Sequence, residues 1–116
     1  MMMQVPDFRV EFPEADVPQA MWSGVDQHRY PDLSAEAQNV YITALPSNQG
    51  TIWLGWSKVS SASGAETGRP LQPGEQAFYA HVCLKELYGA ADTATVTASG
   101  ALAVSYEQPR NAARPT

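Results

Sequence analysis

The 116-residue chain contains one cysteine, two histidines, two lysines and no long apolar run. The lone Cys83 excludes an internal disulfide. No segment approaches the roughly 20 apolar residues that a membrane-spanning helix needs, and no basic or apolar region resembling a secretory signal follows the initial methionines. Scarce cations in an acidic chain argue against general affinity for nucleic acid or anionic membranes. Because the chain has a single cysteine and no recognisable secretory signal, we expect it to assemble in a reducing cytoplasm.

Motifs for catalysis or metal binding are also missing. His28 and His81 lie in none of the spacings typical of zinc sites, and the glycine-containing segment 63–68 has no phosphate-binding lysine. His81 and Cys83 would share one face of a strand, but no oxyanion donor accompanies them, so Cys83 is interpreted as a small buried hydrophobe. The acids of the first segment lack the calcium-loop pattern and are interpreted as solvated charge. We predict a protein that is not an enzyme, with no cofactor and no metal ion of its own.

The acidic charge is unevenly distributed along the chain. Twelve Asp and Glu against seven Lys and Arg give a net charge of −5. Seven of the acids and only two of the bases lie in residues 1–36, whereas residues 37–116 hold five of each and are neutral. A split of this kind favours an acidic arm joined to a neutral folded body.

The first 36 residues are rich in proline, at Pro6, Pro13, Pro18 and Pro31, which makes a long helix improbable. Apolar residues near the start come close to alternation, which predicts one short strand or an extended arm with an adhesive face. We expect residues 1–36 to be an extended acidic arm that docks on a partner. Its predicted partner-binding residues are Phe8, Val10, Phe12, Trp22 and Tyr30.

Residues 37–108 have the pattern of a β-rich body. Runs of β-formers predict strands over 40–45, 51–56, 75–84 and 102–107, with a hairpin over 93–107 and a long loop over 57–73. The 75–84 strand is apolar on both faces, which favours a central position, and helix is conceivable only around 34–38. The tail 109–116 is expected to be loose. The predicted fold is all-β: a small antiparallel β-sandwich, jelly-roll-like, or a barrel, with the proline-rich arm extending from it.

Two tryptophans stand out in the 51–56 segment. Strict alternation places Trp53 and Trp56 on opposite faces, so both cannot be ordinary core residues unless Gly55 introduces a bulge that changes the register. A glycine inside a strand indicates either a bulge or a close backbone approach. Large aromatic side chains contribute heavily to interfaces. One of the two tryptophans is therefore predicted to bind a partner.

The stretch GTIWLGWSKVSSASGAETGRPLQPGEQAFY, residues 50–79, carries a family resemblance. A hydrophobic strand ends in an element of the form G-[ILV]-[YW]-[ILV]-G. Ser-x-Val follows it, and then comes a Gly-rich loop that ends in Leu-x-Pro-Gly-Glu. The matching residues are 50–55, with Thr51 inserted, then Ser57, Val59, Gly68, Leu71, Pro73, Gly74 and Glu75. This pattern resembles small β-rich structural proteins of tailed bacteriophages, and the resemblance covers residues 38–106.

The resemblance implies a homo-oligomeric virion component without catalytic residues. The first interpretation is a capsid decoration (cement) protein that binds the major capsid protein or another virion protein, self-associates as a dimer or trimer, and resides on the capsid surface. The alternative is a receptor- or glycan-binding module of a head fibre or tail that uses Trp53 or Trp56. A small bacterial enzyme or lectin-like sandwich unrelated to phages is a third interpretation.

Overall fold

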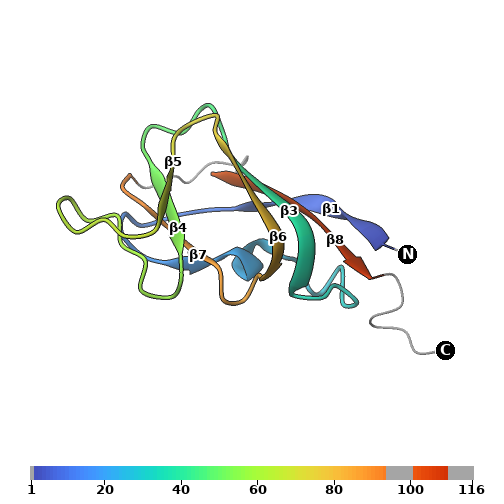
Figure 1. The fold of residues 1–116 in the computed structure, drawn as a ribbon. Helices are drawn as coiled ribbons and strands as arrows, with labels where there is room; N and C mark the ends of the chain where they lie inside the picture. The colour runs from blue at the N-terminus through green and yellow to red at the C-terminus, as the bar shows by residue number, and fades with distance from the viewer. Residues whose placement is uncertain (1, 94–100, 110–116) are drawn as a thin grey trace.

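The structure, a computed structural model, describes residues 2–93 and 101–109. Within these ranges eight strands form two antiparallel four-stranded sheets that pack on each other (Figure 1). The strands are β1 (Met2–Val10), β2 (Gln19–Ala20), β3 (Glu36–Ala44), β4 (Ile52–Gly55), β5 (Arg69–Leu71), β6 (Gln76–Cys83), β7 (Tyr88–Ala91) and β8 (Leu102–Pro109). One short 3₁₀ turn, η1 (Met21–Gly24), follows β2. The predicted all-β sandwich is confirmed.

The strand order is that of a jelly roll. One sheet has the order β1-β8-β3-β6 and the other β2-β7-β4-β5. Every connection between described strands crosses from one sheet to the other except β4 to β5, which are neighbours in the same sheet. Each sheet presents one apolar face to the other, and the side chains of both inner faces form a single core.

Strand β8 lies inside its sheet and contributes a continuous row of buried side chains. Leu102, Val104, Tyr106 and Gln108 alternate inward. The strands on both sides of β8 each carry one extra residue relative to it, between Val5 and Phe8 in β1 and between Gln38 and Tyr41 in β3. Asn39, in the second bulge, has a left-handed backbone with φ 50°. Pro6 lies in the first, where a missing N–H does least harm.

The polar ends of two buried β8 side chains form hydrogen bonds with the backbone of the segment before β3. The Tyr106 hydroxyl donates to the Ser34 carbonyl oxygen at 3.2 Å. Gln108 accepts from the Ser34 N–H at 2.8 Å through Oε1 and donates to the Asp32 carbonyl at 3.4 Å through Nε2. Burial of the ring raises the pKa of Tyr106 to about 12. A buried phenol and a buried amide are thus satisfied by one backbone segment.

The N-terminal segment is part of the sandwich, which corrects the expectation of an arm apart from the body. Strand β1 pairs with β8, and β2 pairs with β7. Val5, Val10, Phe12 and Met21 are buried in the common core. Because the charged residues of β1 alternate with these apolar ones, the local acidic charge is compatible with a half-buried edge strand. The proposed boundary at residue 36 therefore does not separate a core-free segment from a folded one.

Other local predictions had mixed outcomes. Each of the four strands predicted over 40–45, 51–56, 75–84 and 102–107 overlaps a described strand, although the ends differ by a few residues. However, β6 is an edge strand rather than a central one, and the 34–38 region leads into β3 without forming a helix. The loop 57–73 contains the short strand β5. The first half of the predicted hairpin and all but residue 109 of the predicted tail lie outside the described residues.

Core burial of Phe12 predicts that its removal destabilises the fold. Phe12→Ala is expected to lower the free energy of unfolding by about 3–5 kcal/mol, because the aromatic side chain leaves a cavity. Chemical denaturation followed by tryptophan fluorescence measures this. The neighbouring exposed Glu11 is the control, and Glu11→Ala is expected to stay within about 0.5 kcal/mol of the parent. Equal stability of both variants would restore the separate-arm interpretation.

The raised Tyr106 pKa predicts alkaline instability. A phenol with a folded-state pKa of about 12 and an unfolded value of 10.0 contributes stability that is complete below pH 10 and is lost as pH rises toward 12. Tyr106→Phe should remove this loss, while costing about 1 kcal/mol at neutral pH through the Ser34 contact. Denaturation curves between neutral pH and pH 12 measure both effects. Replacement of the exposed Tyr41 by Phe is the control and should retain the alkaline loss.

Candidate functional site

The most exposed large aromatic side chain among the described residues is Trp56, at 65%. Strand β4 directs Ile52 and Leu54 into the core and ends at Gly55, so Trp56 follows the strand rather than continuing its alternation. Trp53 is half-buried on the outer side of β4. Of the two tryptophans predicted as alternatives, Trp56 is the more exposed.

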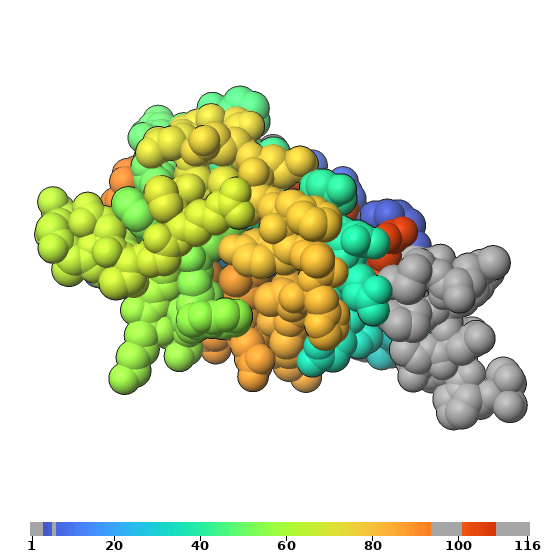
Figure 2. All heavy atoms as spheres, in the orientation of Figure 1, coloured from blue at the N-terminus to red at the C-terminus, as the bar shows by residue number. Residues whose placement is uncertain are grey.

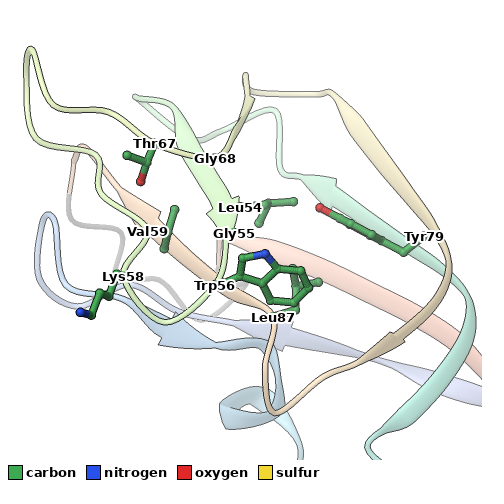
Figure 3. A pocket seen from close by; sticks show the side chains of 9 residues that line it. All are labelled: Leu54, Gly55, Trp56, Lys58, Val59, Thr67, Gly68, Tyr79 and Leu87. Carbon is green, nitrogen blue, oxygen red and sulfur yellow. The ribbon is translucent and has the colours of Figure 1, made fainter.

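Trp56 stands in a cleft of about 440 Å³ between the end of β4, the β4–β5 loop and β6 (Figure 3). The hydroxyl of Tyr79 points into the space between its own strand and β4, while Lys58 extends away from the other lining side chains. The lining is mostly apolar, with few polar atoms, and its volume lies within the range of small-ligand sites. The lining residues are Leu54, Gly55, Trp56, Lys58, Val59, Thr67, Gly68, Tyr79 and Leu87.

Two glycines allow the loop to fold back and form one wall of this cleft. A Cβ at Gly55 would lie 3.2 Å from Cγ2 of Val59, so the missing side chain lets Val59 pack directly over the strand. A glycine in the predicted strand indicated a bulge or a close backbone approach, whereas the tight neighbour here is a side chain. Gly68 has φ +89°, and a Cβ there would collide with the Leu54 carbonyl oxygen. Gly68 is therefore required for the position of the loop, and Gly55 makes room for the tight packing of Val59.

The same loop is hydrogen-bonded to the segment between β1 and β2 through Asp16. Its Oδ1 accepts from the Ser61 N–H at 2.8 Å, and the hydroxyls of Ser61 and Ser60 lie 3.1 and 3.4 Å from it. The hydrogen bond from the Ser61 N–H is the main cause that lowers the pKa of Asp16 below its usual value. The Asp16 N–H itself donates to the Ala91 carbonyl at 2.8 Å. Asp16 thus links the loop that contains Val59 to β7, through its side chain on the loop and its backbone N–H on Ala91.

The polar side chains of the cleft are the phenol of Tyr79, the hydroxyl of Thr67 and the ammonium group of Lys58. Partial burial raises the pKa of Tyr79, an effect that the nearby charge of Arg69 opposes. Tyr79 is therefore a neutral hydrogen-bonding group at neutral pH, and Lys58 adds a positive charge at the rim. None of the described residues that line this cleft is a carboxylate. The site can hold a flat apolar face against aromatic rings and hydrogen-bond a polar edge.

Trp56 also lines a second hollow, of about 500 Å³, together with Ser57, Lys85, Glu86 and Tyr88. Lys85 lies with its Nζ 5.8 Å from the centre of the Trp22 ring. Trp56 therefore separates two depressions on neighbouring parts of the surface. A side chain in this position can be enclosed from more than one direction when a partner docks.

The remaining predicted partner-binding residues are not gathered around Trp56. Val10 and Phe12 are fully buried in the protein's own core, which corrects their assignment as anchors on a partner. Phe8 and Trp22 are half-buried and pack against that core, and Phe8 makes an edge-to-face contact with Tyr106 at 6.1 Å. Tyr30, also half-buried, lies beneath the Arg29 guanidinium at 5.3 Å.

One exposed aromatic pair was not predicted as a site. Tyr41 on β3 and Phe78 on β6 are opposite each other, 43% and 47% exposed, with ring centres 5.0 Å apart. They lie on the outer face of the β1-β8-β3-β6 sheet. The alternation of each strand was visible in the sequence, but the pair became recognisable only once the two strands were known to be neighbours.

His81 and Glu36 form an exposed pair, with Nε2 and Oε2 3.4 Å apart. No group of three or more His, Cys, Asp or Glu residues in positions to hold a metal ion occurs in ranges 2–93 and 101–109. Across the same ranges, no helix has the length and apolarity needed to cross a bilayer. Comparison with known protein families, curated proteins and solved structures finds no match to this chain.

The Asp16 contacts predict an acid-sensitive loop. The lowered pKa means that the carboxylate contributes stability above its unfolded value of 3.8, and this contribution is lost as pH falls through the lower folded value. Asp16→Asn should increase proteolytic cleavage within residues 60–68 at neutral pH. Limited proteolysis with mass spectrometry measures it, and the exposed Asp7→Asn variant is the control. Equal cleavage in both variants would show that Asp16 does not hold the loop.

Proposed function

We propose that this protein is a non-enzymatic structural component of a tailed-bacteriophage virion, a capsid decoration protein that binds and stabilises the head shell. Its partner is the major capsid protein or another virion protein. The protein acts after assembly in the host cytoplasm, on the capsid surface. The resemblance of residues 50–79 to such proteins supports this proposal.

The single observation that carries the proposal is the jelly-roll strand order with an exposed tryptophan at its surface. Jelly rolls are shared by viral capsid domains, among other protein classes. The fold alone does not define a function, so the argument rests on the site. Residues 50–75, which carry the resemblance, include β4, the loop and β5, and these form most of the cleft beside Trp56. The segment that resembles virion proteins is thus the segment that presents the binding surface.

Docking would act through Trp56 as an anchor. An indole that is 65% exposed, between two depressions, can bury a large apolar area when a partner covers it. Lys58 in the first depression suits a partner surface that presents carboxylates or backbone carbonyls, whereas the second depression carries one charge of each sign, Lys85 and Glu86. The rigid sandwich would then require little rearrangement on binding.

The alternative function is a receptor- or glycan-binding module of a head fibre or tail. A specific feature favours it, because Trp56 and Tyr79 line one cleft together with Thr67 and Lys58. A sugar ring offers an apolar face for an aromatic ring and hydroxyls for polar groups, and this lining provides both kinds of contact. Jelly rolls also include lectin domains.

Electron microscopy of purified phage particles that encode this chain separates the two functions. Density for the sandwich at many equivalent positions on the head lattice is expected for a decoration protein. Density confined to a unique vertex or to fibre tips would support the receptor- or glycan-binding alternative instead. Particles that lack the protein altogether would contradict both.

Substitution of the exposed tryptophan tests the binding surface. Trp56→Ala is expected to weaken retention on particles by roughly 30-fold, since a central tryptophan contributes about 2 kcal/mol or more to an interface. Quantitative co-sedimentation with capsids measures this, and thermal unfolding checks that the fold persists. Trp53→Ala, on the outer side of the same strand, is the control and should retain binding. Equal loss in the two variants would remove Trp56 from the interface.

A further inference from the structure

The four edges of the two sheets are unequally protected against pairing with another chain. Among the described strands, the edge strands are β1, β6, β2 and β5. Strand β1 contains Pro6 and a bulge, and charged Asp7 and Arg9 occur along it. Strand β2 has two residues, and β5 has three, including Arg69 and Pro70. Shortness, proline, bulges and charge are the usual features that prevent edge pairing.

Strand β6 has none of these protections. It spans eight residues, Gln76–Cys83, without proline, lysine or a carboxylate, and its only titratable side chain with a basic group is His81. Its pairing with β3 keeps one constant register from Thr43↔Gln76 to Glu36↔Cys83. At about 3.3 Å per residue this edge offers roughly 25 Å of backbone for pairing. In Figure 2 the yellow-orange atoms of β6 lie uncovered on the near surface beside β3.

Exposed apolar side chains accompany this open edge. Phe78 is 47% exposed and Ala80 is also exposed. Phe78 extends the apolar surface onto β3 through its contact with Tyr41. A long, uncharged edge strand with exposed apolar side chains is a predicted site of association with another chain.

We propose that β6 is a self-association surface, on which a second copy of this chain adds its own β6 in the antiparallel direction around a two-fold axis. The two β1-β8-β3-β6 sheets would then form one continuous antiparallel sheet of eight strands. This inference depends on the edge strands and not on the proposed function. It narrows the expected self-association, dimer or trimer, to a two-fold dimer.

Charge and length favour a second copy as the occupant. The chain carries a net charge of −5, so most surfaces of two copies repel each other, but β6 brings no fixed charge of either sign to the junction. Of the strands described, β6 is the one full-length edge without protection, so its best-matched partner in length and polarity is another β6. A two-fold axis makes such a contact self-complementary.

The dimer would also bring the Trp56 clefts toward the junction. Tyr79 belongs to β6 and lines the cleft beside Trp56. Each copy would therefore present its cleft on the flank of the joined strands. A pair of tethered sites on one rigid body binds a repetitive surface more tightly than either site alone.

Analytical ultracentrifugation of the full chain over a concentration series tests the proposal. The parent should sediment with twice the chain mass at high concentration. Ala80→Lys places two like charges near the junction and should raise the dimer dissociation constant at least about tenfold. Gln4→Lys is the matched control, because it adds the same charge to an exposed position on β1, the opposite and already protected edge of the same sheet, and should leave the dimer intact.

Hydrogen–deuterium exchange locates the contact independently of the variants. Amides of residues 76–83 should become protected as the concentration of the parent rises, whereas those of β1 should not. A parent that is monomeric at every concentration, a trimer, or equal dimerisation of both lysine variants would overturn the proposal. Protection of 76–83 that arises only on capsids would assign the edge to another virion protein and likewise overturn it. The outcomes measured on the isolated protein do not bear on where it lies on the particle, so they test the dimer separately from the proposed function.

Discussion

The whole sandwich depends on the pairing of β8 with strands on both of its sides. Strand β8 joins β1 to β3, and it contributes Leu102, Val104 and Tyr106 to the core. Without it, β1 would have no partner among the described strands, and one edge of β3 would lose its paired strand. The bulges on either side adjust β1 and β3 to this strand, so that both still direct apolar side chains inward. Tyr106 and Gln108 then fix the segment that enters β3.

Much of the fold could be predicted from the sequence because its strands are short, rich in β-formers and separated by turn residues. The alternation of Ile52 and Leu54 correctly indicated a strand. The glycine that follows them was predicted to mark a bulge or a close backbone approach, whereas the tight neighbour of Gly55 is the Val59 side chain. What could not be predicted was pairing. Neither the edge position of β6 nor the contact between Tyr41 and Phe78 has a local signature, because both depend on which strands become neighbours.

The N-terminal segment illustrates the same limit. Its prolines and acidic charge are local features, and they suggested an arm, whereas the burial of Phe12 depends on residues far away in the chain. The bulge near Pro6 shifts the inward positions from Val5 to Phe8 and Val10, which blurs the alternation that identifies a strand. For the candidate site, the sequence identified a choice between two tryptophans. Because β4 ends at Gly55, Trp56 lies outside the strand and is the more exposed of the two.

The pairing of β1 with β8 also has a consequence in time. Met2 lies opposite Pro109 and Val10 opposite Leu102, so β1, the first of the described strands to be synthesised, is completed only by β8, the last of them. Until β8 is synthesised, β1 lacks its partner strand. The prolines and charges along this segment oppose its pairing with other chains during that time. Contacts so distant along the chain make closure of the sandwich a slow, late step in folding.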